Sequence, residues 1–517
     1  MNFLHDQHIL ILGVGASGLA LARWCVRMGA RVTVADTREA PPQQATLAAE
    51  LPQVRLVCGP LHEGLVQGTD VRAVFKSPGL TPASVAPVWS AAVAMGLWVG
   101  GELDVFARSL AELQSTQSYQ PKILAITGTN GKTTVTSLTG LLVERAGLSV
   151  AVAGNIGPTL LDTLAERLDA DQLPQVWVLE LSSFQLECSQ GFEPTAATVL
   201  NLTQDHLDWH GSMQAYAQAK ARIFGSHTVM VLNRGDAAVM AMADQPSAKG
   251  VAAKGRPARE MLTFGTDEPL RAGDYGLQNL NGMNWLVRAQ EPDDVPRRRR
   301  AQGQASDAVV QDAAEWLMQR LMPADALRIR GQHNATNALA ALALAQAAGC
   351  SLAPMLYGLR EYHGEPHRVE SIGLIHEVEY FDDSKATNVG ATVAAIEGLG
   401  SERRLVLLLG GDGKGQDFAP LAAPVARYAR VVLLIGRDAA ALRLALAGTG
   451  VVMQDAASLE EAVQLASTLA QSGDAVLLSP ACASLDMFKN YEHRAQVFVQ
   501  AVQQLAHQQG VVWEGVA

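Results

Sequence analysis

Short apolar runs alternate along the chain with longer segments rich in alanine and leucine. The longer segments have helical character, for example Ser17–Met28, Lys132–Arg145 and Thr336–Ala348. Because strand–helix alternation is typical of parallel sheets covered by helices, the pattern predicts an α/β protein. The apolar runs with the length of a strand are His8–Leu12, Arg31–Ala35, Arg72–Phe75, Lys122–Ile126, Val176–Leu181, Ala197–Asn201, Thr228–Leu232, Leu405–Leu409, Val431–Ile435 and Ala475–Leu478.

The alternation restarts twice, which indicates domain boundaries. One restart follows the polar stretch Gln114–Gln120, and the other follows the segment His363–His367. The pattern therefore predicts three α/β domains, which we place at residues 1–100, 101–365 and 366–517.

Residues 279–325 interrupt the pattern within the second predicted domain. They contain Pro292, Pro296 and the arginine run at 297–300, and no sustained periodicity returns before Ala313. We expect a long surface insertion here rather than a functional basic patch, because acidic residues adjoin the arginines.

Composition excludes several classes of protein. Hydrophobic residues make up 48% and charged residues 18% of the 517 residues, which is not the composition of a disordered chain. A net charge of −11 speaks against a broad nucleic-acid-binding surface. No apolar run reaches the roughly 18 residues of a membrane span. The five cysteines form no CxxC pair, and the first apolar run lacks the basic region of a signal peptide, so a cytoplasmic setting is expected.

The first candidate site is a glycine loop, Gly13-Val14-Gly15-Ala16-Ser17-Gly18. It follows a predicted strand and opens a predicted helix, and Asp36 ends the next strand. This is the dinucleotide-binding fingerprint in its required context, with NAD as the default ligand. A glycine turn without a ligand remains the alternative.

The second candidate is a phosphate loop, Gly128-Thr129-Asn130-Gly131-Lys132-Thr133-Thr134, again between a strand and a helix. Its backbone can surround phosphates, the lysine can reach the β and γ phosphates, and the first threonine can bind Mg²⁺. It departs from the strict P-loop, which requires glycine at the position of Ile126. Two phosphate sites weaken the interpretation as a dehydrogenase, because hydride transfer needs no ATP.

Three further residues are candidate metal ligands. Glu180 ends a predicted strand, and His206 follows another, so both belong to the sheet edge where open α/β sheets bind ligands. Glu180 suits the oxygen preference of Mg²⁺. Taken alone, His206 is more typical of a hydrogen-bonded structural histidine, and Lys220 is typical of a solvated helix residue.

The third predicted domain carries three polar turns after strands, at residues 382–388, 410–414 and 479–484. Each brings small residues, hydroxyls or a lysine to a strand end, which suits a carboxylate or phosphate. An ordinary α/β turn is at least as good an interpretation of each alone, but three in one domain favour a site.

Together these motifs resemble the Mur ligase family, and within it the branch that adds D-glutamate. The likeness covers nearly the whole chain. Its most specific parts are GTNGKTT at 128–134, ELSSFQLE at 180–187, GQHNATNALAA at 331–341, DSKATN at 383–388 and SPACASLDMFKN at 479–490. The resemblance implies a Rossmann-like UDP-binding domain, a central P-loop ATPase-type domain and a C-terminal Rossmann-like domain.

The resemblance also implies a reaction. The carboxylate of UDP-N-acetylmuramoyl-L-alanine attacks the γ-phosphate of ATP, and the amine of D-glutamate displaces phosphate from the resulting acyl phosphate. We expect a monomer that acts in cytoplasmic peptidoglycan precursor synthesis.

The resemblance assigns roles to residues by motif. Lys132 neutralises charge during phosphoryl transfer. Thr133 and Glu180 bind one Mg²⁺, and His206 and Lys220 bind a second. A lysine ammonium has no lone pair for a metal, and the family implies that Lys220 is carbamylated.

The resemblance also assigns the binding residues. The UDP-contacting positions are Ser17, Asp36, Thr37, Arg38 and Ser77. Asn155 binds near the reacting carboxylate. The positions near ATP, beyond the phosphate loop, are Asn334, Asn337, Arg368 and Asp383. The D-glutamate positions are Lys385, Thr387, Lys414, Ser484 and Tyr491. Two departures are Tyr491, where the family often has phenylalanine, and Ala495, where glycine is usual.

The sequence alone leaves two alternative functions to consider. An NAD-dependent oxidoreductase would use the first glycine loop, but it would leave the second loop and the DSKATN segment unexplained. A non-catalytic nucleotide-binding regulator would have no need to retain Lys132, Glu180, His206 and Lys220 together.

Overall fold

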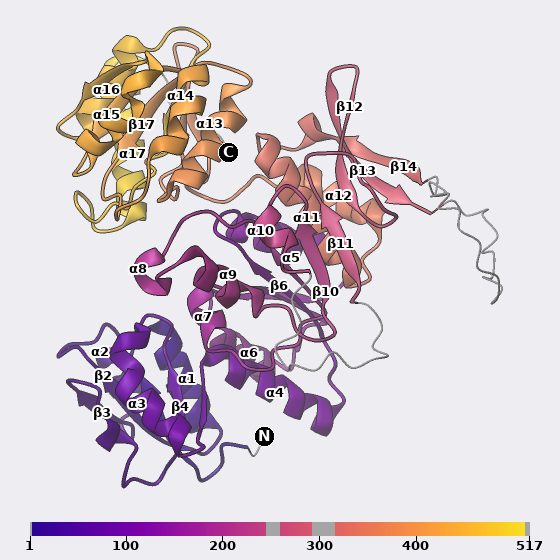
Figure 1. The fold of residues 1–517 in the computed structure, drawn as a ribbon, viewed down its shortest axis with the longest axis vertical. Helices are drawn as coiled ribbons and strands as arrows, with labels where there is room; N and C mark the ends of the chain where they lie inside the picture. Colours follow the sequence, from indigo (N-terminus) through magenta and orange to yellow (C-terminus); the bar gives the residue numbers. More distant parts are fainter. Residues whose placement is uncertain (1–2, 244–258, 292–315, 512–517) are drawn as a thin grey trace, which may run out of the picture.

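The computed structural model describes residues 3–243, 259–291 and 316–511. Three α/β domains follow one another along the chain, each built on its own mainly parallel sheet (Figure 1). The predicted fold class is therefore confirmed. The central domain lies between the other two in the view of Figure 1.

The first sheet is five-stranded and parallel, with the order β3-β2-β1-β4-β5. β1 and β4 are almost wholly buried, as expected for parallel strands covered by helices on both faces. Its strands are β1 (His8–Leu12), β2 (Arg31–Asp36), β3 (Arg55–Cys58), β4 (Val71–Lys76) and β5 (Trp98–Gly100). Its helices are α1 (Ala16–Arg27), α2 (Gln44–Glu50) and α3 (Pro82–Ala94).

The central sheet is six-stranded and parallel, with the order β11-β10-β9-β6-β8-β7. Its strands are β6 (Lys122–Thr127), β7 (Val150–Gly154), β8 (Val176–Glu180), β9 (Ala196–Val199), β10 (Val229–Asn233) and β11 (Met261–Phe264). Its helices are α4 (Glu102–Gln117), α5 (Lys132–Arg145), α6 (Leu160–Asp169), α7 (Ser183–Glu187), α8 (Leu207–His210), α9 (Met213–Ala221), α10 (Ala237–Met240), α11 (Gln332–Ala347) and α12 (Leu352–Glu361).

The two faces of the central sheet enter different cores. Leu124 and Ile126 of β6 pack against α5 and α11, whereas the intervening Ala125 joins a core with Trp177 and helices α4 and α6. That second core continues into α1 of the first domain, since Trp24 belongs to the same cluster. The first two domains therefore share buried apolar surface.

A three-stranded antiparallel sheet, β12-β13-β14, contains most of the described residues of the expected insertion at 279–325. Its strands are β12 (Tyr275–Leu280), β13 (Met283–Gln290) and β14 (Leu317–Pro323). The break in the strand–helix alternation therefore contains antiparallel strands, which the periodicity did not predict. Asn281 and Gly282 both have positive φ, 52° and 84°, and join β12 to β13 in a tight hairpin. Pro292, Pro296, the arginine run and Ala313 lie outside the described residues.

The third sheet has the order β15-β16-β20-β17-β18-β19, and only the β15–β16 pair is antiparallel. Its strands are β15 (Glu370–Ile375), β16 (Val378–Asp382), β17 (Leu405–Gly410), β18 (Ala429–Ile435), β19 (Val452–Asp455) and β20 (Ala475–Leu478). Its helices are α13 (Val389–Gly400), α14 (Ala422–Tyr428), α15 (Ala439–Leu446), α16 (Leu459–Leu469) and α17 (Tyr491–Gln508). Short 3-10 turns lie at Glu63–Leu65, Ala324–Ala326, Ala419–Leu421 and Ala447–Thr449.

All the predicted strands are present within a few residues of their expected bounds. The apolar-run criterion missed short or half-exposed strands, including β3 and β19 at the sheet edges. Within the described residues, no helix is both long and apolar enough to cross a membrane.

Candidate active site

The phosphate loop between β6 and α5 depends on two glycines. Gly128 has φ 149° and Gly131 has φ 82°, a region that side chains strongly disfavour. A Cβ on Gly131 would also lie 2.8 Å from Oδ1 of Asn337, and one on Gly128 would lie 3.0 Å from Cβ of Leu200. The loop conformation therefore requires both glycines.

Lys132 opens α5 and folds back over this loop. Its Nζ donates to the carbonyl oxygens of Gly128 at 3.0 Å and Thr129 at 2.9 Å. Burial lowers the pKa of Lys132, while the Glu180 carboxylate acts in the opposite direction. The cation therefore sits at the loop that the sequence predicts to hold phosphates.

Lys220 of α9 approaches the same loop from the other side. Its side chain is 1% exposed. Nζ donates to Gly128 O at 2.9 Å and Thr127 Oγ1 at 3.2 Å, so it shares the Gly128 carbonyl with Lys132. Burial and then the Lys132 charge lower the pKa of Lys220 well below its usual value. The expectation of a solvated helix lysine is wrong.

Glu180 is the last residue of β8 and is 1% exposed. Its Oε1 accepts a hydrogen bond from Nδ2 of Asn155 at 2.7 Å. Its Oε2 is buried and has no hydrogen-bond partner. A buried carboxylate oxygen without a partner is unfavourable, and a bound cation would satisfy it.

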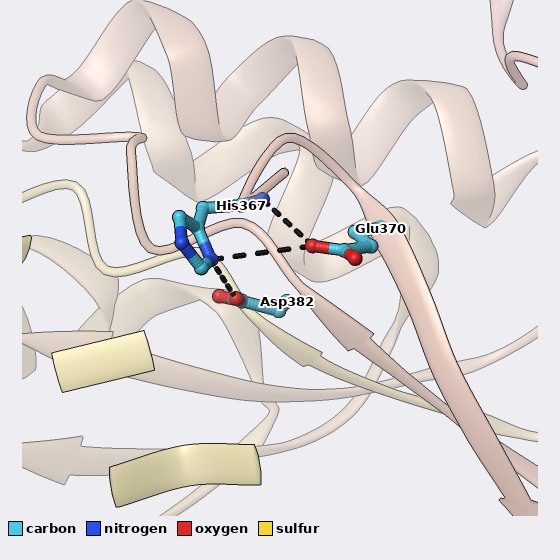
Figure 2. A group of neighbouring side chains, drawn as sticks. All are labelled: His367, Glu370 and Asp382. Atoms are coloured by element: carbon cyan, nitrogen blue, oxygen red, sulfur yellow. Dashed lines mark hydrogen bonds and ion pairs between the residues drawn. The ribbon is translucent and has the colours of Figure 1, made fainter. Parts of the chain in front are cut away.

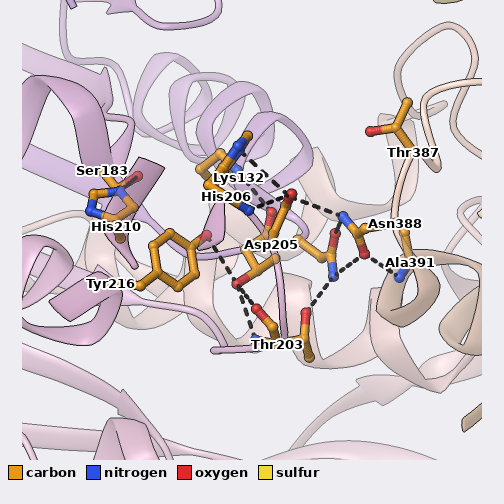
Figure 3. Close-up of polar contacts among 12 residues, drawn as sticks. Lys132, Ser183, Thr203, Asp205, His206, His210, Tyr216, Thr387, Asn388 and Ala391 are labelled. Carbon is orange, nitrogen blue, oxygen red and sulfur yellow. Dashed lines mark hydrogen bonds and ion pairs between the residues drawn. The ribbon is translucent and has the colours of Figure 1, made fainter. Parts of the chain in front are cut away.

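His206 lies just before α8, with φ 53°. Its Nε2 is 3.5 Å from Oδ2 of Asp205 (Figure 3). Its ring packs edge-on against the ring of Phe184, with the two centroids 4.8 Å apart. Burial lowers the pKa of His206, partly opposed by Asp205. A neutral imidazole is the form that binds metals.

The third domain reaches the phosphate loop at two points. Arg368 donates from Nη2 to Oγ1 of Thr133. Asn388 exchanges side-chain hydrogen bonds with Asn130, at 3.0 and 3.3 Å, and its amide also lies 3.5 Å from Asp205 (Figure 3). Asn388 was not among the predicted site residues, although it ends the DSKATN motif. As the N-cap of α13, it fixes that helix against the loop.

A cavity of about 290 Å³ lies between the central and third domains. Among the residues that line it are Asn130, Asn334, Asn337, Arg368, Asp383 and Lys385. Nδ2 of Asn337 donates to Oδ1 of Asn334 at 3.1 Å. Burial raises the pKa of Asp383 to about 7, despite the hydrogen bond from Ser479. The structure thus brings the predicted ATP positions together.

A turn beside this cavity contains Arg368, and Figure 2 shows three residues that shape it, His367, Glu370 and Asp382. His367 donates from its backbone N to Oε2 of Glu370 at 2.8 Å, and its Nδ1 lies 2.7 Å from Oδ2 of Asp382. The bond to Asp382 raises the pKa of His367. Side-chain atoms of these three residues lie within 4.8 Å of one another, but their hydrogen bonds already account for the arrangement. The sequence pattern did not reveal this cluster, because Glu370 and Asp382 lie on neighbouring antiparallel strands and meet only when these pair.

The glycine loop of the first domain is held by Asp36. Its Oδ2 accepts from Val14 N at 2.8 Å and from Arg38 Nη2 at 2.7 Å. Burial raises the pKa of Asp36, but the bonds from Arg38 and Val14 outweigh burial and hold it at about 2. A Cβ on Gly18 would lie 2.0 Å from Gly13 O, so helix and loop touch directly. Thr37 is exposed beside this carboxylate.

Ser17 belongs to this loop and Ser77 packs against it, since a Cβ on Gly13 would lie 3.0 Å from Cβ of Ser77. Ser17 hydrogen-bonds the buried Glu102, whose pKa is raised to about 7 chiefly by burial. Ser77 donates from its backbone N to Leu12 O at 2.8 Å. All the predicted UDP positions therefore gather at one end of the first sheet.

The predicted D-glutamate positions come from several turns of the third domain. Nζ of Lys385 lies 3.6 Å above the ring of Tyr491, and burial lowers the pKa of Lys385 to about 8. Lys414 has φ 51°, and its backbone N donates to Asp412. Thr387 lies beside Asn388 in Figure 3, and Ser484 is buried.

Arg494, 1% exposed, holds the two flanking turns together. It donates to Ser384 Oγ at 3.0 Å and to the carbonyls of Cys482 and Ser384 at 3.0 and 2.8 Å. The sequence did not reveal this role. Ala495 is buried within the regular helix α17, so the departure from glycine leaves the helical backbone intact.

Comparisons with known proteins match each domain separately. Residues 7–101 match the model of the Mur ligase MurD-like N-terminal domain, residues 126–275 the Mur ligase middle domain, and residues 367–482 the Mur ligase glutamate ligase domain. The chain is 64% identical, over all of both sequences, to the UDP-N-acetylmuramoylalanine–D-glutamate ligase of Albidiferax ferrireducens. It is 56% identical to that of a Polaromonas species, over 99% of this chain and all of the relative.

Solved structures share the architecture at low identity. The MurF ligase of Thermotoga maritima in complex with ADP superposes with a TM-score of 0.56 at 14% identity, covering 97% of this chain and 96% of that one. The UDP-N-acetylmuramate–alanine ligase MurC of the same organism gives a TM-score of 0.52 at 19% identity, over 97% and 100%. These likenesses concern the fold alone.

Proposed function

The chain belongs to the Mur ligase family, and from that premise we propose that it is an ATP-dependent ligase. It joins D-glutamate to UDP-N-acetylmuramoyl-L-alanine through an acyl phosphate, in cytoplasmic peptidoglycan precursor synthesis. The full-length relatives named for this ligation support the substrate assignment. The NAD interpretation of the first glycine loop is superseded, since residues 7–101 match the MurD-like N-terminal domain.

The observation that carries the proposal is the convergence of two lysines on one carbonyl. Lys132 and Lys220 come from different helices, yet both donate to Gly128 O. Arg368 arrives at the same loop from the third domain. The Lys132 and Arg368 cations at this strand-to-helix loop suit a nucleoside triphosphate, and Lys220 places a second amine against the same carbonyl.

The residues fit a divalent metal ion. Oε2 of Glu180 is buried without a hydrogen-bond partner. The Thr133 hydroxyl belongs to the phosphate loop that Arg368 contacts. These two groups would hold Mg²⁺, which prefers oxygen ligands and substrate phosphates. When bound, the ion neutralises the oxygens of the transferring phosphoryl group.

A second ion would be held by His206 and Lys220, with the lysine carbamylated. The amine attacks CO₂, forms a C–N bond and releases one proton, which leaves an anionic oxygen ligand. Only the neutral amine is a nucleophile, and the burial that lowers the pKa of Lys220 favours that form. Carbamylation also removes the conflict of two adjacent cations.

The protein's side chains bind the substrate and stabilise the charge on the transferred phosphoryl group. Asp36, Ser17 and Ser77 hold the UDP end, and Asn155 orients the reacting carboxylate toward the phosphate loop. Lys132 and Arg368 stabilise charge on the γ-phosphoryl group during its transfer.

The second half-reaction uses the third domain. Lys385 and Lys414 pair with the two carboxylates of D-glutamate, so its amine can displace phosphate from the acyl phosphate. Thr387, Ser484 and Tyr491 complete this site. The required groups belong to different domains, so a closed arrangement is needed for catalysis.

The deciding experiment is nucleotide-dependent phosphate release by the full chain with ATP, Mg²⁺ and UDP-N-acetylmuramoyl-L-alanine. Phosphate is expected with D-glutamate and not with L-glutamate or D-aspartate. A folded protein that releases no ADP under these conditions contradicts the proposal, and thermal stabilisation by NADH but not by UDP would support an oxidoreductase instead. Sedimentation tests whether the protein acts as the expected monomer.

A further inference from the structure

Lys76 is a buried lysine at the junction of the first two domains. It ends β4, pairs in register with Leu12 of β1 and directly precedes Ser77. Only 4% of its side chain is exposed. A buried ammonium group is costly unless it is paired, so its contacts identify what this residue does.

The Lys76 ammonium contacts the central domain at the Glu187 carboxylate, the Trp209 ring and the Cys188 thiol. Nζ lies 3.6 Å from Oε2 of Glu187 and 5.7 Å from the ring centroid of Trp209. Nε1 of Trp209 donates to the same Oε2 of Glu187 at 3.2 Å. Lysine, carboxylate and indole therefore form one connected group, with a cation–π contact on its side.

The two partners of Lys76 belong to the segments that carry proposed metal ligands. Glu187 is the last residue of α7, the helix that follows Glu180 at the end of β8. Trp209 lies in α8, the helix that begins directly after His206. Phe184 of α7 joins these segments, with ring centroids 4.8 Å from His206 and 4.4 Å from Trp209.

Other polar contacts across this junction lie elsewhere. Arg23 donates to Oδ2 of Asp162 at 3.1 Å, and Arg27 donates to both carboxylate oxygens of Asp169 at 2.8 and 2.5 Å. Both arginines belong to α1, and both carboxylates belong to α6. Among these junction contacts, the one made by Lys76 lies at the end of β4, next to the proposed UDP-contacting residue Ser77.

We propose that Lys76 is a positioning residue that fixes the UDP-holding turn of the first domain against α7 and α8. This inference rests on the proposed function. Ser77 would hold the nucleotide end of the substrate, while His206 and Glu180 bind metal at the other end. The Lys76–Glu187–Trp209 group sets the distance between them, so the substrate carboxylate arrives in line with the γ-phosphate.

The test compares Lys76→Met, which keeps the length of the side chain and removes its charge, with Lys122→Met at an exposed lysine of the central sheet. In Lys76→Met, kcat should fall about tenfold or more, because small misplacements of reacting groups are costly. The Kd for UDP should stay within about twofold of wild type, and the Mg²⁺ concentration for half-maximal activity should rise.

Unchanged kcat and Mg²⁺ dependence in folded Lys76→Met would overturn the proposal. A Kd for UDP that rises as much as kcat/KM falls would also overturn it, because Lys76 would then be a ligand of the nucleotide. If Lys76→Met fails to fold, Glu187→Gln provides the same comparison, and the same unchanged parameters would count against the proposal.

Wild-type activity is measured in the same experiment and tests the proposed function separately. If the wild type does not ligate D-glutamate, the proposed function fails. If the wild type is active and Lys76→Met matches it, only this inference fails.

Discussion

The guanidinium of Arg368 donates a hydrogen bond to the hydroxyl of Thr133, although 235 residues separate them in the chain. Arg368 stands between α12 and β15, in the turn shaped by His367 and Glu370, and Thr133 lies in the phosphate loop. This contact joins the third domain to the proposed nucleotide site. The same hydroxyl is a proposed Mg²⁺ ligand, so Arg368 is expected to release it and contact phosphate when ATP binds.

We therefore expect Arg368→Ala to lower kcat/KM for ATP by about 100-fold, the loss typical of removing one charge-stabilising group. UDP binding should be unchanged, because its site lies in another domain. Steady-state kinetics and calorimetry measure the two effects. Arg443→Ala, at a half-exposed arginine paired with Asp455, is the matched control. Equal losses in both variants would contradict the assignment.

Lys132→Ala should abolish acyl-phosphate formation, with phosphate release reduced by about 1,000-fold or more. Lys132 donates to two carbonyls of the phosphate loop, which places its charge where the γ-phosphoryl group is expected. The Kd for the UDP substrate should stay within about twofold. Loss of UDP-substrate binding in a folded variant would show that the two sites are not separate.

Lys220→Ala should be inactive and partly regain activity with acetate or another small carboxylate, because the vacated space accepts an anionic oxygen ligand. Lys220→Arg is the control, since its side chain fills that space and forms no carbamate. Rescue is measured as phosphate release against acetate concentration. Full activity of Lys220→Ala without additive would rule out the carbamate.

The pH dependence for D-glutamate should reflect Lys385, whose pKa is lowered to about 8 by burial. Below that pH the ammonium is charged and can pair with a substrate carboxylate. As pH rises through 8 it loses its proton, so kcat/KM for D-glutamate should fall. Lys385→Arg should move this decline to higher pH, since arginine keeps its charge. An identical alkaline limb in both proteins would exclude Lys385 as its source.

Gly18→Ala should destabilise the first domain by about 1–3 kcal/mol, the range for overpacking a close contact. The added Cβ would lie 2.0 Å from Gly13 O, so either α1 or the glycine loop must shift. UDP affinity should fall in parallel. Gly448→Ala is the control, because its Cβ meets no atom within 4 Å. Chemical denaturation of both variants measures the difference.

The hydrophobic pattern located the strands that are almost fully buried, because these are continuous apolar runs. β1 and β20 have the predicted bounds, and β6 differs from its prediction by one residue. It failed at β13 and β14, where the burial pattern is irregular and prolines and arginines interrupt the sequence between the strands. Local pattern predicts an element only where one side of it is consistently buried.

The site residues could likewise be predicted only where their signal is local in the sequence. The glycine positions and Lys132 were predictable, because phosphate loops need a local sequence with positive φ and a lysine at a fixed offset. Lys220 was not predictable from its neighbours, since nothing local indicates that its helix turns it into the core. Arg494 and Lys76 carried no local signal, because each acts through residues distant in the chain. Asn388 was indicated only by its place at the end of the DSKATN motif, and its partner Asn130 is also distant.

The sequence by itself determined the α/β class, the three-domain order and the two phosphate loops, since these depend on periodicity and on motifs a few residues long. The tertiary structure decided which groups share an environment. It placed Lys132 and Lys220 on one carbonyl, left Oε2 of Glu180 buried without a partner, and brought Arg368 to Thr133. Burial and long-range pairing set the charge states of such groups, and both arise only when separate segments pack together.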